Sequence, residues 1–448
     1  MTKQYWDRAI ETMERSELLQ LQFKKLQSLL ESTVQTNPFY RDRWNKAGVK
    51  LDRISTLQDF TAMIPTVEKA DFVADQNDCP PLGKRHQHAV DLHCPMIFTN
   101  TSGTSGQGVE IHAQTAAEFR TTEHIYGFHM RWSGLSDGDR VFLTLPITMM
   151  TGGRVEYHGA VASGLSVFAV GNYDARRKIE LMKRYQPRAL FGTTSYFGHL
   201  SAVCDNPGSF GVDRLLTGGE GSGFAWLERL ESSWGAKVFD RYGSTQSGND
   251  HMFCCEHGIG TSKRPGMLHN IDHLVLFEVV DSQTGRQVKD GEVGEIVLTS
   301  LYHNQTPLIR CRMRDRALYR SHGYCACGRP FAGVEVATIA RLDDMKKVKG
   351  VNIWPQAVDS VMFAEQHVDE YQVHLQSSDT GADIATMRVM PKTALSAGEA
   401  EAWTAAMVDK LRTRIGISFD IELVDAGAIE RSEYKAKRWL DGRLHAQR

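Results

Sequence analysis

The stretch LSVFAVGNYDARRKIELMKRYQPRALFGTTS, residues 165–195, is enough to indicate the fold class. Its first apolar run, 165–171, indicates a buried strand, and residues 175–186 have the spacing of a helix. Residues 188–195 form a second apolar run that ends in Thr193, Thr194 and Ser195. A strand, a helix and a strand in this order predict a βαβ unit with parallel strands.

The same alternation continues on both sides of that stretch. Further strands are predicted at 139–146, 213–220 and 236–245, and further helices at 154–163, 197–204 and 222–235. We therefore expect an α/β fold with a mostly parallel, doubly wound sheet. Such sheets bind ligands at the carboxyl ends of their strands, which makes three loops candidate binding segments: 193–195, 217–220 and 242–245.

The ends of the chain have other patterns. Residues 16–35 predict an amphipathic helix with Ser16 as its N-cap. Apolar runs at 273–281 and 294–301 are separated by turn residues, which predicts antiparallel β structure. From residue 347 onward, strand-like and helical segments begin again, so a separate small α+β domain is expected there.

The composition excludes several classes of protein. The chain has 448 residues, 41% of them hydrophobic and 24% charged, with a formal net charge of −2. A balance so close to neutral favours neither nucleic acid nor an anionic membrane as partner. No apolar run is long enough for a transmembrane helix, and the N-terminal residues lack the apolar core of a signal peptide. The expected location is cytoplasmic.

The segment TNTSGTSGQG, residues 99–108, is rich in glycine and hydroxyl side chains and lies between two short apolar runs. Its backbone N–H groups and hydroxyls suit phosphate oxygens, because glycine lets the ligand approach closely. The Lys-Ser/Thr pair and the helix of a P-loop are missing. Taken alone, the segment fits a phosphate loop and a plain surface hairpin equally well.

Four further motifs follow this loop in a fixed order. They are YGSTQSG (242–248), PLIRCRMRDRAL (307–318), ARLDDMKKVKGVNIWP (340–355) and GAIERSEYKAKR (427–438). The series resembles the acyl-adenylate-forming superfamily, and specifically its phenylacetate–CoA ligase branch, along essentially the whole chain. The resemblance implies a large multilayer N-terminal domain, residues 1–340, with mostly parallel sheets plus a β-rich subdomain. It also implies a mobile C-terminal domain, residues 341–448.

The resemblance further implies the reaction and its residues. ATP and a carboxylic acid would give an acyl-AMP and pyrophosphate, and the acyl group would then pass to the thiol of CoA. Thr245 and Lys435 are the expected catalytic residues, Thr245 at the α-phosphate and Lys435 at the carboxylate and phosphate. The expected ATP- and AMP-binding residues are Thr101, Ser102, Gly103, Thr104, Ser105, Gly106, Gly219, Glu220, Tyr242, Gly243, Ser244, Thr245, Asp315 and Arg341.

Within that set, the resemblance assigns adenine packing to Tyr242, both ribose hydroxyls to Asp315, and a place near the ribose and phosphate to Arg341. Asp343 is the expected hinge, and Gly350 would meet CoA. Expected pocket residues for the acid are Met149, Met150, Tyr157, His158, Tyr196 and Gly218, although the two methionines fit a core position as well. The basic run 346–349 fits either a solvated face or contact with CoA phosphates.

Three residues depart from the pattern of the superfamily. Gln107 stands where the phosphate loop usually has Lys, and Tyr434 replaces the Gly before Lys435. Gln246 stands where a Glu usually helps to hold Mg²⁺, which leaves a neutral ligand at that position. These differences could slow adenylation or change how the metal is used.

The eight cysteines are not expected to form disulfides in a reducing compartment. Cys255, His257, Cys325 and Cys327 offer three sulfurs and an imidazole, a set that suits a structural zinc ion. Cys254 is an alternative to Cys255, because its spacing to His257 is also acceptable. Cys79, Cys94, Cys204 and Cys311 are the scattered remainder and fit small buried positions.

The sequence leaves three functions open. The first is an aryl-carboxylate–CoA ligase that uses ATP, Mg²⁺ and CoA, with an acid of phenylacetate, benzoate or anthranilate type. The second adenylates an acid and loads it onto a carrier-protein phosphopantetheine or an amine. The third is a weakly catalytic adenylate-binding protein, which Gln107 and Gln246 motivate. A homodimer is expected from the branch, and a zinc-knuckle nucleic-acid binder is disfavoured by the charge.

Overall fold

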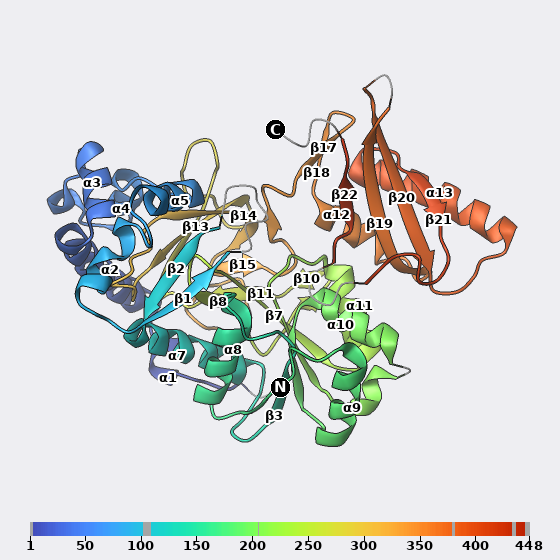
Figure 1. Cartoon of the computed structure of the whole chain (residues 1–448), viewed down its shortest axis with the longest axis horizontal. Helices are drawn as coiled ribbons and strands as arrows, with labels where there is room; N and C mark the ends of the chain where they lie inside the picture. The colour runs from blue at the N-terminus through green and yellow to red at the C-terminus, as the bar shows by residue number, and fades with distance from the viewer. Residues whose placement is uncertain (1–2, 102–108, 205, 379–380, 432–435, 444–448) are drawn as a thin grey trace.

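The computed structural model describes residues 3–101, 109–204, 206–378, 381–431 and 436–443. It shows a large domain and a small C-terminal domain that packs against one end of it (Figure 1). The α/β fold class predicted from the sequence is confirmed. None of the helices in these ranges combines the length and apolarity that crossing a bilayer requires.

Five parallel strands form the centre of the large domain in the order β4-β3-β5-β6-β7. They are β3 Arg140–Leu143, β4 Ser166–Ala169, β5 Ala189–Gly192, β6 Arg214–Thr217 and β7 Lys237–Ser244. The helices between them are α8 Thr151–Ala162, α9 Ala175–Tyr185, α10 Thr194–Val203 and α11 Phe224–Trp234. Each of these elements was predicted from the alternation of apolar runs and helical spacing.

The antiparallel strands that follow extend the same sheet. They are β8 Asn249–Cys254, β11 Met267–Asn270, β12 Val275–Val280, β13 Val293–Ser300, β14 Cys311–Arg320, β15 Gly333–Glu335 and β16 Ala340–Arg341. β7 pairs with β8 in an antiparallel manner, so the predicted β-rich region continues the central sheet. A short hairpin, β9 Gly260–Thr261 with β10 Arg264–Pro265, lies apart from it.

The N-terminal part contributes helices and one hairpin. The helices are α1 Arg8–Glu11, α2 Arg15–Thr36, α3 Pro38–Lys46, α4 Leu57–Met63, α5 Lys69–Asp78, α6 Gln87–Asp91 and α7 Ala116–Trp132. The hairpin pairs β1 Met96–Asn100 with β2 Ile111–Thr115. The prediction of Ser16 as the N-cap of α2 was wrong. The helix already begins at Arg15, and Glu14 occupies the N-cap position.

The small domain has the predicted α+β composition. Its sheet has the order β21-β20-β19-β22, and a separate hairpin pairs β17 with β18. The elements are β17 Lys346–Val348, β18 Val351–Ile353, α12 Pro355–Met362, β19 Val368–Ser377, β20 Asp383–Pro391, α13 Ala397–Ile415, β21 Asp420–Leu423 and β22 Trp439–Asp441.

An aromatic contact joins the two domains. Trp226 of α11 lies against Phe363, which follows α12, with 4.3 Å between the ring centroids. The Arg438 guanidinium of the small domain lies over both rings, 5.5 Å from Trp226 and 4.7 Å from Phe363. Gly223 permits this approach, because a Cβ there would come within 2.6 Å of the Ser360 hydroxyl.

Candidate functional site

Two hydrogen bonds join Thr101 to Glu110, which lie on either side of the predicted phosphate loop. The Thr101 amide donates to the Glu110 carbonyl at 3.0 Å, and the Glu110 amide donates to the Thr101 hydroxyl at 3.1 Å. These bonds continue the β1–β2 hairpin by one residue beyond the Asn100–Ile111 pair. Ser102, Gly103, Thr104, Ser105, Gly106 and Gln107 lie outside the described residues.

Tyr242 and Asp315 meet at the end of β7. The Tyr242 hydroxyl donates to Asp315 Oδ2 at 2.8 Å, and both side chains are buried. Asp315 also faces Arg341 across the β14–β16 pair, with 3.8 Å between Arg341 Nε and Asp315 Oδ1. Burial raises the pKa of Asp315, and burial together with the nearby carboxylate raises that of Tyr242 well above its ordinary value. Tyr242 therefore stays protonated and acts as the donor.

The turn after Tyr242 is shaped by Gly243. A Cβ at Gly243 would lie 2.2 Å from the Asn249 carbonyl oxygen, so no side chain fits there. The Ser244 amide and hydroxyl bond the Ser247 hydroxyl at 3.2 and 3.1 Å. The Gly248 amide then donates to the Thr245 carbonyl at 3.1 Å. The closed turn leaves Thr245 partly exposed at the carboxyl end of the sheet.

Glu220 is held by the beginning of α10. Its Oε1 accepts from the Thr194 hydroxyl and the Ser195 amide, both at 2.6 Å, and its Oε2 accepts from the Ser195 hydroxyl at 2.9 Å. A carboxylate at a helix N-terminus is favoured by the free amide groups there. Gly219, with a φ of 80°, makes the turn that brings Glu220 to this position. Two of the predicted loops are thus joined by one carboxylate.

A buried ionic group below Gly218 was missed by the sequence analysis. Arg241 Nε donates to Asp250 Oδ2 at 2.9 Å, and its Nη2 bonds Glu156. The Tyr126 hydroxyl donates to the same Asp250 oxygen at 2.6 Å. Burial raises the pKa of Glu156 to about 7 in spite of the neighbouring guanidinium. A charged Arg241 inside an otherwise buried strand was the signal that could have pointed to this group.

The predicted pocket residues do not all come together. Met149 is 49% exposed, Met150 is the N-cap residue of α8, and Tyr157 and His158 lie on α8. His158 Nδ1 lies 3.4 Å from Glu123 Oε1. Tyr196 is buried, and its hydroxyl accepts from Lys178 Nζ at 2.8 Å, so packing between α9 and α10 accounts for this side chain. Gly218 leaves no room for a side chain, because a Cβ there would lie 2.7 Å from Arg241 Cγ.

Asp343 lies where the chain leaves the large domain. Its Oδ1 accepts from Arg314 Nη2 at 3.1 Å, and its Oδ2 lies 3.5 Å from Arg341 Nη2. Arg314 and Arg341 belong to β14 and β16 of the large sheet. Gly350 lies in the β17–β18 turn with a φ of 81°, and a Cβ there would meet no atom within 4 Å. The predicted hinge is therefore tied to the sheet by two ion pairs, and the predicted CoA-binding turn is open.

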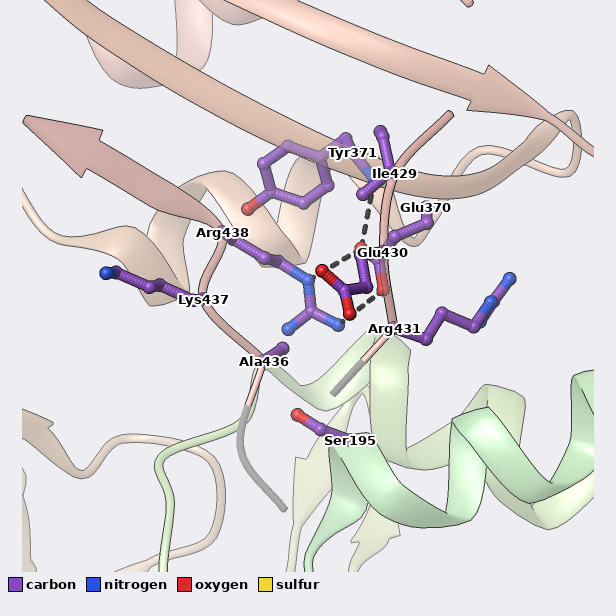
Figure 2. Close-up of a pocket in the computed structure, with 9 residues that line it drawn as sticks. All are labelled: Ser195, Glu370, Tyr371, Ile429, Glu430, Arg431, Ala436, Lys437 and Arg438. Atoms are coloured by element: carbon purple, nitrogen blue, oxygen red, sulfur yellow. Dashed lines mark hydrogen bonds and ion pairs between the residues drawn. The ribbon is translucent and has the colours of Figure 1, made fainter. Parts of the chain in front are cut away.

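Lys435 and Tyr434 lie outside the described residues, but the chain on either side is anchored on β19. Arg438 makes a bidentate pair with Glu370, with N–O distances of 2.7 and 3.0 Å. Arg431 Nη2 donates to Asp369 at 2.6 Å. Glu370, Arg431 and Arg438 line a small cleft, and Ser195 at the start of α10 lies on its other side, as Figure 2 shows.

Four soft ligands form a candidate metal centre. The ligand atoms of Cys255, His269, Cys325 and Cys327 all lie within 4.8 Å of one another. Cys255 Sγ is 3.6 Å from Cys325 Sγ, and Cys327 Sγ is 3.5 Å from His269 Nε2. Hydrogen bonds from the Cys255 and Cys325 thiols lower the pKa of Cys327. Three sulfurs and an imidazole at such spacing suit tetrahedral zinc.

The sequence prediction of His257 as the fourth ligand is wrong. His257 is exposed, because the chain turns after Cys255 and carries its ring outward, with the Gly258 amide bonded to the Cys255 carbonyl at 2.8 Å. The imidazole beside the sulfurs is His269, which β11 brings there by pairing with β8. Cys254 ends β8 in the core and does not belong to the cluster.

The sheet, its carboxyl-end turns and the small domain define the fold of the adenylate-forming enzymes. Residues 26–302 match the family described as "AMP-binding enzyme", and residues 350–443 match "AMP-binding enzyme C-terminal domain". The chain therefore belongs to the AMP-binding enzyme family. The resemblance to the phenylacetate–CoA ligase branch is confirmed by relatives that match nearly the full length.

One relative is the phenylacetate-coenzyme A ligase of Pseudomonas putida, 27% identical, with 98% of both chains covered. The enzyme of the same name from Aromatoleum evansii is 26% identical and covers 97% of this chain and 96% of its own. A structure of 2-hydroxyisobutyryl-CoA ligase in the postadenylation state, with 2-HIB-AMP, has a TM-score of 0.89 at 25% identity. It covers 98% of this chain and 92% of its own.

The same ligase in the thioesterification state gives a TM-score of only 0.70. That match has the same 25% identity and covers 98% of this chain and 93% of the other. Because one sequence gives both values, the difference reflects the conformation of that ligase. The domains of the present protein are therefore arranged as in the postadenylation structure.

Proposed function

We propose that this protein is an AMP-forming acid–CoA ligase that makes an acyl-AMP from ATP and a carboxylic acid and transfers the acyl group to CoA. The observation that carries the proposal is the Tyr242–Asp315 hydrogen bond at the carboxyl end of the sheet. It places a flat aromatic ring beside a carboxylate that can accept from two hydroxyl groups, as an adenosine requires.

The remaining residues have roles that follow from their positions. Thr101 and the loop that begins there would hold the leaving pyrophosphate, and Thr245 would donate to the α-phosphate. The ammonium group of Lys435 would neutralise the charge that develops as the carboxylate attacks phosphorus. Asp343 would be the hinge of the small domain, and the open turn at Gly350 would face CoA.

Magnesium would be held by oxygen donors at the phosphate side of the turn. The Thr245 hydroxyl and the Gln246 amide oxygen are donors of the kind that Mg²⁺ accepts, and both residues are partly exposed there. When bound, the ion would neutralise charge on the phosphates. The residues present therefore fit the cofactor, although the position lacks a carboxylate.

The acid is proposed to be a small aromatic one, of phenylacetate, benzoate or anthranilate type. The names of the curated relatives support this choice, and the name of the neighbouring 2-hydroxyisobutyryl-CoA ligase favours a hydroxylated aliphatic acid as the second candidate. The acceptor is proposed to be CoA, with carrier-protein phosphopantetheine as the alternative.

The test is acid-dependent pyrophosphate release across a panel of aromatic and hydroxy acids, with CoA, a carrier protein or no acceptor. An acyl-CoA product supports the ligase, and product on the carrier alone supports the alternative acceptor. No pyrophosphate release with any acid would leave the weakly catalytic adenylate-binding protein. Lys435→Ala should abolish adenylation far more than the use of preformed acyl-AMP, and equal loss in both would refute its role.

We also propose that Cys255, His269, Cys325 and Cys327 hold a structural zinc ion. The four ligand atoms come from three separate segments, so a bound ion would join β11 to the turn after β8 and to the segment after β14. Four protein ligands leave no position for substrate, and the role of the ion would be to stabilise the fold.

A further inference from the structure

Glu110 is a buried carboxylate that lies two residues after the segment 102–108. Its side chain has no exposed surface, and its backbone makes both hydrogen bonds that join it to Thr101. An ionised carboxylate in such a place needs hydrogen-bond donors, because burial disfavours the charge. The groups that surround the Glu110 carboxylate therefore indicate its role.

One oxygen of Glu110 is occupied by a histidine. His112 Nε2 lies 2.5 Å from Glu110 Oε1, and His112 Nδ1 lies 3.0 Å from Arg85 Nη1. Because a guanidinium can only donate, Nδ1 is the acceptor and the ring proton is on Nε2, the nitrogen that lies next to Glu110. Burial lowers the pKa of His112, in keeping with a neutral ring. Glu110 thus carries the negative charge.

The other oxygen of Glu110 faces the nucleotide turn. Gln246 Nε2 donates to Glu110 Oε2 at 3.0 Å, across 136 residues of sequence. Only the NH₂ group of the amide can face a carboxylate, so the carbonyl oxygen Oε1 is on the other side. Gln246 is partly exposed and directly follows Thr245. Among the described residues, none donates a hydrogen bond to this oxygen, which leaves it available to a ligand at the phosphate side of the turn.

We propose that Glu110 is a positioning residue that holds the Gln246 amide with its oxygen toward the cation of the metal–nucleotide complex; this rests on the proposed function. The arrangement also explains why residue 246 is not a glutamate. Two carboxylates at 3.0 Å would repel each other, so the pair can hold one negative charge, which here resides on Glu110.

The test compares Glu110→Gln, Gln246→Glu and the double variant that exchanges the two side chains. In Glu110→Gln, the new amide oxygen accepts from His112 and its NH₂ faces Gln246, which must turn its own NH₂ toward the cation. In Gln246→Glu, two carboxylates face each other. In the double variant, the amide at position 110 accepts from His112 and donates to the carboxylate at position 246, so every hydrogen bond is restored. The two single variants fail for different reasons, and the exchange repairs both.

The measurement is Mn²⁺ binding by electron paramagnetic resonance in the presence of α,β-methylene-ATP, which cannot react at the α-phosphorus. We expect each single variant to weaken Mn²⁺ binding about 10-fold or more, as loss of a partner of a metal ligand does, and the double variant to recover most of that loss. Glu278→Gln is the matched control, because Glu278 is a buried carboxylate paired with Arg310 in a different part of the sheet. It should lower the unfolding temperature and leave Mn²⁺ binding unchanged.

Two outcomes would overturn the inference alone. One is wild-type Mn²⁺ binding in folded Glu110→Gln, and the other is a double variant as weak as the single ones. If Glu110→Gln does not fold, Gln246→Met removes the amide from the more exposed partner, and unchanged Mn²⁺ binding in that variant would have the same meaning. If wild-type protein with the nucleotide analogue fails to bind Mn²⁺, the proposed function and this inference both fail.

Discussion

Phe363→Leu should separate the two half-reactions, because Phe363 contributes to an interface between the domains. Its ring lies 4.3 Å from that of Trp226, and the guanidinium groups of Arg229 and Arg438 lie 5.7 and 4.7 Å from its centroid. Trp226 and Arg229 belong to α11 of the large domain, and Arg438 directly precedes β22 of the small one. The contact is made in the arrangement that matches the postadenylation structure.

The magnitude follows from the contacts that leucine cannot make. An aromatic pair adds about 0.5–1.5 kcal/mol beyond its burial, and a cation–π contact at a partly exposed site adds about 0.5–1 kcal/mol. Leucine keeps most of the apolar burial of phenylalanine. The observed arrangement should therefore lose about 1–2.5 kcal/mol relative to others, which is about 5- to 60-fold in the equilibrium between domain arrangements.

The assay measures the two half-reactions separately. Acid-dependent ATP–pyrophosphate exchange reports adenylation, and CoA-dependent consumption of preformed acyl-AMP reports thioester formation. Exchange should fall by up to the factor above, and thioester formation should stay the same or rise. Phe419→Leu is the control, because Phe419 is buried within the small domain and contacts Trp439. Equal losses in both half-reactions, or the same pattern in Phe419→Leu, would refute the reasoning.

Three further predictions concern stability, nucleotide binding and the metal. Burial raises the pKa of Asp240 to about 7, so the folded state favours the protonated acid. The free energy of unfolding should therefore fall as the pH rises from about 4 to about 7, by about 4 kcal/mol at most. Asp240→Asn should match wild type near pH 4 and unfold at higher temperature than wild type at pH 8; parallel pH curves would contradict this. Tyr242→Phe keeps the ring but removes the bond to Asp315, and calorimetry should show AMP binding about 5-fold weaker. Elemental analysis of the wild-type protein should find one zinc ion per chain. The Cys327→Ser variant should contain no zinc and should unfold at a lower temperature. Wild-type protein without metal would rule the site out.

The parts of the fold that could be predicted are those that local patterns determine. The strands and helices from 139 to 245 were visible because a buried parallel strand is a short apolar run and the helices between have a different period. The joining of the antiparallel region to the parallel strands was not visible. It depends on the pairing of β7 with β8, which places a bulge at Tyr242 and Gly243 and has no signature in either strand alone.

The metal centre shows the same limit at the level of one residue. His257 was preferred because it lies two residues from Cys255, and spacing along the chain was the only available measure of distance. In the structure, the turn at Gly258 carries His257 to the surface, while the pairing of β11 with β8 brings His269 to the sulfurs. A ligand delivered by strand register can be found only once the register is known.

The candidate site as a whole also combines features that the sequence predicts with contacts that it does not. Its motif residues are readable because each sits in a short segment of distinctive composition, but the groups that hold them come from distant segments. Glu110 reaches Gln246 across 136 residues, and Tyr242 reaches Asp315 across 73. Each of these bonds is buried or partly buried, so a partner left unpaired would cost more than the bond itself contributes. The site therefore needs segments that are distant in the sequence to come together, and the amide at Gln246 can be understood only beside the distant carboxylate of Glu110.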